Sequence, residues 1–143
     1  MDDDPFGEFM NRIHGFLRRV VVLVPWVLGA YVALMFAATH TPVSNIPSTL
    51  PGTDKHWHFL GYFGLGLLLS LWGQVRFANW PVVTLVTIAL YGAADELLQI
   101  PVGRQAEFLD WAADMAGAAT GIAATVLLTA PRWMASFARS RAG

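Results

Sequence analysis

The sequence predicts an all-α, polytopic membrane protein: a bundle of four transmembrane helices with both chain ends in the cytoplasm. Of its 143 residues, 55% are hydrophobic and only 13% are charged, whereas soluble domains contain about 25% charged residues. Four apolar stretches approach the roughly 20 residues that a helix needs to cross a bilayer. Basic residues also concentrate in the segments that would lie on one side of such a membrane.

The four apolar stretches comprise residues 20–39, 57–73, 81–100 and 108–130. We expect a helix in each, because the bilayer core offers no hydrogen-bonding partner to an open backbone. The stretches are continuously apolar and lack the alternation that is typical of membrane β-strands. A single membrane domain over residues 19–130 therefore accounts for most of the chain.

The segments outside these stretches are shorter and more polar. Residues 1–18 carry apolar side chains near helical spacing, which suits a helix at the inner membrane interface; a disordered tail is the alternative. Residues 131–143 are expected to form a cytoplasmic tail. The connection at residues 74–79 is short, so the second and third helices should form a tight antiparallel pair. The loop at residues 40–53 contains three prolines and is expected to fold over the outer face.

The distribution of basic residues predicts the orientation, because Lys and Arg favour the cytoplasmic side. If the N-terminus lies inside, only Lys55 and Arg104 lie outside, against seven arginines inside. The seven are Arg12, Arg18, Arg19, Arg76, Arg132, Arg139 and Arg141. This imbalance predicts an N-in, C-in topology.

Small residues recur at four-residue spacing along the fourth stretch, at Ala113, Gly117, Gly121 and Thr125. Small residues so spaced allow two helix backbones to approach closely. We expect this stripe to pack against another helix of the same chain.

The polar residues of the domain concentrate at the outer ends of the second, third and fourth helices. They are Asp54, Lys55, His56, His58, Asp95, Glu96, Gln99, Arg104, Glu107, Asp110 and Asp114. An ionisable group near the bilayer centre costs at least about 2.5–3.5 kcal/mol and normally faces the bundle interior. Residues four apart share a helix face, which predicts three converging faces. These are Asp54, His58 and Tyr62; Tyr91, Asp95 and Gln99 with Glu96 beside them; and Asp110, Asp114 and Gly117.

Such a cluster could bind an anion. The second and fourth helices begin at the outer surface, where their positive dipole ends and the cations Lys55 and Arg104 favour negative charge. Neighbouring carboxylates and histidines could act as acid and base or hold a divalent metal. No residues have the spacing of a metal motif, however, so no metal ligand is assigned and the cofactor is left unknown.

Simpler roles are open for several of these residues. Asp54 is a favoured N-cap type, Asp110 suits a helix N-terminus, and His56 and Glu107 suit exposed positions. The whole cluster could also be a set of salt bridges that locks the helices. The net charge of −1 gives no reason to expect a nucleic-acid partner, and no nucleophile elbow, phosphate loop or dinucleotide fingerprint is present.

The same residues carry a family resemblance over residues 54–121. The run Asp54 to Phe59, followed by Tyr62, resembles the DKxxHF opening of the VanZ-like family. The run Tyr91 to Gln99 resembles its YxxxDExxQ segment, and Gly103–Arg104 resembles the GR that follows. The closing helix of the family is matched by Asp110, Gly117 and Gly121, but Asp114 stands where the family usually has Asn.

The resemblance implies a small, multi-pass protein of the bacterial cytoplasmic membrane, in a family whose namesake is linked to resistance to the glycopeptide teicoplanin. We therefore expect a cell-envelope protein whose outer-leaflet site binds an anionic lipid or a lipid-linked cell-wall precursor, for example one carrying a polyprenyl phosphate. The expected ligand-binding residues are Asp54, Lys55, Tyr62, Gln99, Arg104, Asp110 and Asp114.

Whether the site also catalyses a reaction is left open. In an enzyme, Glu96 or Asp95 would be the general base and His58 its acid–base partner. The main alternative is a non-enzymatic structural or interaction module. Transport of a small ion is a weaker alternative, because the polar groups stop at the outer half of the bundle.

Overall fold

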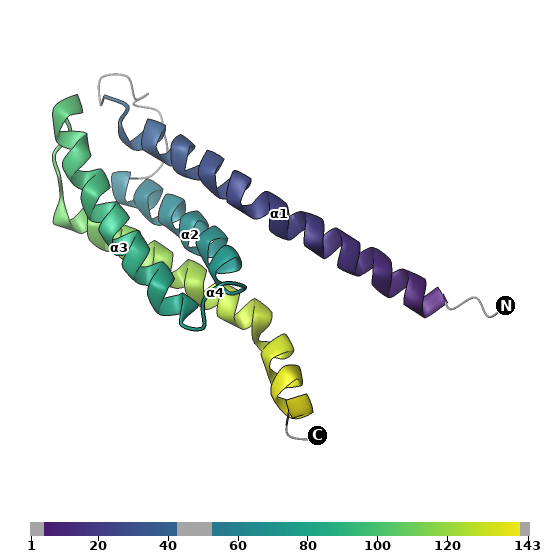
Figure 1. Ribbon diagram of the computed structural model, residues 1–143. Helices are drawn as coiled ribbons and strands as arrows, with labels where there is room; N and C mark the ends of the chain where they lie inside the picture. The colour runs from purple at the N-terminus through teal and green to yellow at the C-terminus, as the bar shows by residue number, and fades with distance from the viewer. Residues whose placement is uncertain (1–4, 43–52, 141–143) are drawn as a thin grey trace.

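The computed structural model describes the backbone of residues 5–42 and 53–140 and the side chains of residues 22–42 and 53–129. Over these residues the chain is helical, with no strand. The elements are α1 (Pro5–Thr39), α2 (Asp54–Gly73), α3 (Trp80–Gln99), the short 3-10 helix η2 (Ile100–Val102) and α4 (Phe108–Ser140). Figure 1 shows α2, α3 and α4 packed together, with α1 beside α2.

Three helices are long and apolar enough to cross a membrane, over Val22–Thr39, Trp80–Val102 and Phe108–Thr129. Their outward side chains include Trp26 on α1, Leu90 on α3 and Leu127 on α4, all largely exposed. Soluble monomers rarely leave contiguous apolar surface of this kind uncovered. The structure thus confirms an all-helical chain with the features of a membrane protein.

The second predicted span, α2, is not among these three helices. It has the same length as α3, 20 residues, but its first two turns carry Lys55, His56 and His58. Of its glycines, Gly66 faces α4, Gly61 and Gly64 face α1, and Gly73 faces α3, and none adds much apolar character. The length of α2 fits a membrane span, but its composition is not apolar enough to mark it as one. A fourth span at α2 therefore stays a prediction.

The closest helix pair is α2 and α4, and glycines make it possible. A Cβ at Gly117 would overlap the carbonyl oxygen of Phe59, and one at Gly121 would overlap that of Phe63. On the facing helix, a Cβ at Gly66 would lie 2.6 Å from the carbonyl oxygen of Ala118. The structure therefore confirms that the small-residue stripe of α4 packs against a helix of the same chain.

Helices α2 and α3 run antiparallel, joined by residues 74–79, as predicted (Figure 1). Helix α3 begins at Trp80–Pro81, where a proline in the first turn removes no helical hydrogen bond. Between α3 and α4, the indole N–H of Trp111 donates to the carbonyl oxygen of Ala89 at 3.1 Å. The core between the helices centres on Tyr62, Leu65, Ile88 and Ala118.

Helix α1 is longer than predicted. It is continuous from Pro5 to Thr39, so no helix end separates residues 5–18 from the apolar stretch. Only its second half lies beside α2 (Figure 1), where the Tyr31 hydroxyl donates to the Gly61 carbonyl oxygen at 2.9 Å. Helix α4 likewise extends into the predicted tail, as far as Ser140. The loop expected over the outer face falls mainly on residues 43–52, outside the described residues.

The four helices alternate in direction, so the ends of α1 and α3 lie with the starts of α2 and α4. We call this end of the bundle the polar end, because it holds the acidic, basic and histidine side chains described next.

Candidate functional site

The chain reverses sharply after α3, and this reversal builds one side of the site. Pro101 lies in η2 and cannot continue a helical hydrogen-bond pattern. Gly103 then adopts the left-handed conformation, with φ of 80°, which an L side chain rarely adopts. The turn brings Arg104 and Glu107 back towards the start of α2.

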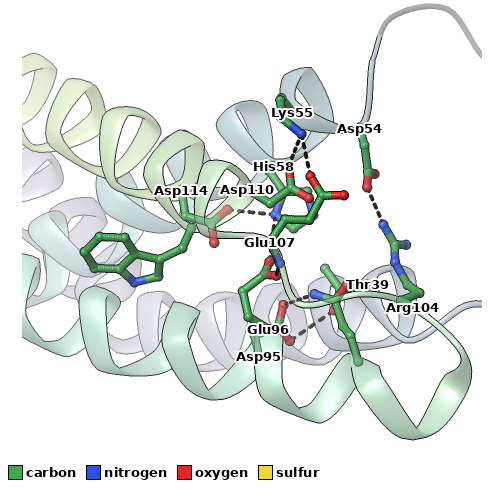
Figure 2. A network of polar contacts seen from close by, with 12 residues as sticks. Thr39, Asp54, Lys55, His58, Asp95, Glu96, Arg104, Glu107, Asp110 and Asp114 are labelled. Carbon is green, nitrogen blue, oxygen red and sulfur yellow. Dashed lines mark hydrogen bonds and ion pairs between the residues drawn. The ribbon is translucent and has the colours of Figure 1, made fainter.

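An outer rim of ion pairs closes the polar end (Figure 2). Arg104 Nη2 lies 2.6 Å from Asp54 Oδ2. Lys55 Nζ bridges two carboxylates, 3.0 Å from Glu107 Oε2 and 2.9 Å from Asp110 Oδ1. The acidic side chains of Asp54 and Glu107 are about half exposed, at 51% and 49%, so solvent reaches both pairs from the acidic side, whereas the Arg104 side chain is itself largely buried.

The two hydrogen bonds to Asp110 and Glu107 raise the pKa of Lys55 above its ordinary value of 10.5. A cation with a raised pKa contributes its full stabilisation below the ordinary value and loses it as the pH rises through the folded-state value. Lys55 therefore stays charged throughout the neutral range.

Beneath the rim, three buried side chains from three helices meet. His58 Nδ1 on α2 is hydrogen-bonded to Asp114 Oδ1 on α4 at 2.9 Å, and lies 3.8 Å from Glu96 Oε1 on α3. His58 is 6% exposed, Glu96 5% and Asp114 0%. We call these residues the buried triad. Glu96 is oriented from its other oxygen, because the backbone N–H of Glu107 donates to Oε2 at 2.9 Å.

Two carboxylate oxygens of the buried triad have no hydrogen-bond partner among the described residues. They are Glu96 Oε1 and Asp114 Oδ2, and both are inaccessible to solvent. The hydroxyl of the fully buried Tyr62 also has no partner there. Gly92 makes room for this arrangement: a Cβ there would lie 3.2 Å from Asp114 Oδ2 and 3.4 Å from the Tyr62 ring.

Asp95 belongs to a different group, although it is adjacent to Glu96 in sequence. It accepts hydrogen bonds from the Thr39 hydroxyl at 3.1 Å and from Gln99 Nε2 at 3.3 Å. His40 Nδ1 lies 3.8 Å from the same carboxylate. This group ties the end of α1 to α3, and Figure 2 shows Thr39 and Asp95 to one side of the buried triad.

Several sequence-based interpretations change at this point. Asp54 does not cap α2, because Thr53 is the N-cap residue and its backbone N–H donates to His56 Nδ1 at 3.1 Å. Lys55 and Arg104, expected to hold an anion, are both already paired with carboxylates. Glu107 is more than a solvated loop charge, since it binds Lys55 and orients Glu96.

The structure brings together nearly all the predicted site residues at the polar end. The sequence analysis missed Thr39, His40 and Gly92. The only signal for Thr39 and His40 was their position at the outer end of the first helix, level with the cluster. Gly92 gave none, because its role depends on Asp114 of another helix.

The arrangement permits two kinds of chemistry. A histidine held by a carboxylate, with a second carboxylate nearby, can transfer protons as a general acid or base. One imidazole and two carboxylates are also suitable metal ligands. Both kinds centre on the buried triad rather than on the adjacent Asp95.

The fold and site define the class of protein: an all-helical chain with apolar helices of membrane-spanning length and a buried polar cluster at one end. No family model, curated protein or solved structure matches the chain.

Proposed function

We propose that this chain is a four-span protein of the bacterial cytoplasmic membrane, with both ends inside. Its polar end binds the anionic headgroup of a membrane lipid or of a lipid-linked cell-wall precursor at the outer leaflet. The proposal concerns binding and includes no chemical step. The seven-to-two distribution of basic residues supports the orientation, and the resemblance to the VanZ-like family supports the envelope setting and a role in glycopeptide resistance.

The observation that carries the proposal is the rim of ion pairs. Lys55 and Arg104 come from different elements, lie at the same end of the bundle, and are each paired with a half-exposed carboxylate, Glu107 or Asp54. A phosphate group could replace these carboxylates, because it offers the same charge-assisted hydrogen bonds. The first turns of α2 and α4 add positive helix ends at the same level.

A second candidate is a purely structural role, in which the ion pairs lock α2 to α4 and to the turn after α3. The observation that favours it is that both cations already have carboxylate partners within 3.0 Å. Glu107 and Asp110 hold Lys55 between them, so no cation at the rim lacks a counter-ion in the part of the chain that the structure describes.

Lipid retention and thermal stability separate the two candidates. The protein is purified in detergent, and native mass spectrometry measures binding of a polyprenyl phosphate, with phosphatidylethanolamine as the zwitterionic comparison. Lys55→Ala and Arg104→Ala should each weaken phosphate-lipid binding about tenfold or more, because a hydrogen bond to a charged group contributes about 1.5–3 kcal/mol. Arg76→Ala is the matched control, since Arg76 lies at the opposite end of α2, over the Trp72 ring.

Removing the competing carboxylates gives a result of opposite sign. Glu107→Gln and Asp54→Asn free part of the charge of Lys55 and Arg104, so they should increase binding of the phosphate lipid. If the rim is only a lock, these variants lower the melting temperature and leave lipid binding unchanged. That outcome, together with unaltered binding by Lys55→Ala and Arg104→Ala, rejects the lipid proposal.

A further inference from the structure

We propose that His58, Glu96 and Asp114 bind one divalent transition-metal ion, of which Zn²⁺ is the best match. The inference concerns the buried triad and does not depend on lipid binding at the rim. It rests on three features of the triad: the spacing of its donor atoms, its charge, and its unpartnered oxygens.

The donor atoms have suitable spacing. His58 Nδ1 lies 2.9 Å from Asp114 Oδ1 and 3.8 Å from Glu96 Oε1, and one ligand atom from each residue fits within 4.8 Å of the others. Zinc binds histidine nitrogen and carboxylate oxygen at about 2.0–2.2 Å, so tetrahedral ligands lie about 3.4 Å apart. The observed distances fall on both sides of this value and need only small side-chain movements.

The charge of the triad favours a dication. Two carboxylates with a neutral imidazole carry a charge of −2, and among the described residues His58 is the only basic group within ion-pair distance of either carboxylate. Buried charges are normally paired or bound to a metal. A dication neutralises the triad completely, whereas protonated His58 neutralises only one of its carboxylates.

A neighbouring set of possible ligands, Asp54, His58 and Asp110, is less suitable. Its carboxylates already have cationic partners, because Arg104 binds Asp54 and Lys55 binds Asp110. A dication bound to this set would have to compete with those side chains. His58 is shared by the two sets, so the uncompensated charge of Glu96 and Asp114 decides between them.

The unpartnered atoms are independent support for a ligand. Glu96 Oε1 and Asp114 Oδ2 are buried without a hydrogen-bond partner among the described residues, and an unsatisfied buried carboxylate oxygen is costly. Glu96 Oε1 is also the atom that faces His58. The Glu107 N–H fixes the other oxygen of Glu96, as outer partners commonly orient metal-binding side chains.

The ligand types narrow the choice of ion. Imidazole suits Zn²⁺ and other transition metals, whereas Mg²⁺ and Ca²⁺ prefer oxygen ligands alone. Three protein ligands leave a fourth position of a tetrahedral site open, as in zinc sites that bind water or substrate. We therefore expect the triad to select Zn²⁺ over Mg²⁺ and Ca²⁺.

Direct metal measurement tests the proposal. The full chain in detergent is stripped with a chelator, and binding of Zn²⁺ and of Mg²⁺ is measured by calorimetry and by elemental analysis after dialysis. We expect one Zn²⁺ per chain, a melting temperature that rises with Zn²⁺ but not with Mg²⁺, and affinity that falls at acid pH as the ligands take up protons. Glu96→Gln and Asp114→Asn should each weaken Zn²⁺ binding at least tenfold, because each removes a direct ligand.

The control variants replace carboxylates that lie near the buried triad but are not proposed as ligands. Asp54→Asn tests the competing set and Glu107→Gln tests adventitious binding at the exposed rim; both should retain one Zn²⁺ with unchanged affinity. The proposal is wrong if the wild-type chain binds no Zn²⁺ and shows no thermal response, a measurement that needs no variant to fold. It is equally wrong if Asp114→Asn keeps full affinity or Asp54→Asn loses it.

Discussion

At the scale of single residues, Gly103 has the most unusual backbone in the described part of the chain. It is the one described residue with positive φ, at 80°, and a Cβ added there would meet no other residue within 4 Å. Glycine is therefore required at this position by the backbone conformation, and not because neighbouring atoms would exclude a side chain. The turn that it makes positions Arg104 for its ion pair with Asp54.

Gly103→Ala should destabilise the protein by about 1–2 kcal/mol, because the left-handed conformation brings Cβ too close to the backbone. Gly103→Asn should lose less, since Asn tolerates this conformation better. Thermal unfolding in detergent measures both. Equal stability of the alanine variant and the wild type would show that the turn adopts another conformation.

Helical spacing predicts much of the site at this scale, but not which charges pair. It placed His58, Glu96 and Asp114 on inward faces, where the structure finds them buried. Helical spacing could not show that Glu107 forms an ion pair with Lys55. That contact joins residues separated by 52 positions and depends on the turn after α3. His40 was missed for a similar reason: its proximity to Asp95 follows from how α1 lies against α3.

At the scale of elements, the α2–α4 contact organises the buried triad. His58 can reach Asp114 only because the two backbones approach closely, and the glycines on both helices permit that approach. Small residues are the usual means of close helix contact in membranes, where no hydrophobic effect drives helices together. Packing one turn below the site thus sets the geometry of the site.

Gly117→Leu should prevent the folded state from forming in detergent, because its side chain would enter space filled by the backbone at Phe59 and Phe63. Gly117→Ala should have a smaller effect of the same sign, about 1–3 kcal/mol, as overpacked sites generally do. Both are measured by thermal unfolding followed by size-exclusion chromatography.

Gly29→Ala is the matched control, because a Cβ at Gly29 on α1 would meet nothing within 4 Å. Alanine is also the better helix former, so this variant should be at least as stable as the wild type. If Gly117→Ala is as stable as Gly29→Ala, the α2–α4 contact is looser than described.

The helices themselves were the most predictable elements. The apolar stretches at residues 81–100 and 108–130 agree with the starts of α3 and α4 to within one residue. The extent of α1 was not predicted, because the arginines near residue 18 end the apolar stretch without ending the helix. Apolar patterning reports where a helix can enter lipid, and helix ends depend on backbone capping as well.

At the scale of the whole molecule, the lengths and directions of the helices predict how many times the chain crosses the membrane. Helix α3 is apolar enough to span a membrane. Helix α2 runs antiparallel beside it and has the same length, 20 residues. Such a helix is about 30 Å long, which matches the hydrocarbon thickness. If α3 spans, α2 therefore crosses the same thickness, shielded on one side by α4.

Accessibility of single cysteines tests the topology, because the chain has no cysteine of its own. Gln105→Cys, at the polar end, should react with a membrane-impermeant maleimide added to intact cells. Val75→Cys, in the exposed turn between α2 and α3, should react only after the cells are opened. Reporter fusions at Gln74 and at the C-terminus should likewise read cytoplasmic, and one at Gly103 external. Three spans would instead put the C-terminus and the N-terminus on opposite sides of the membrane. Labelling of Val75→Cys but not of Gln105→Cys in intact cells would place the polar end in the cytoplasm. That result would contradict binding at the outer leaflet.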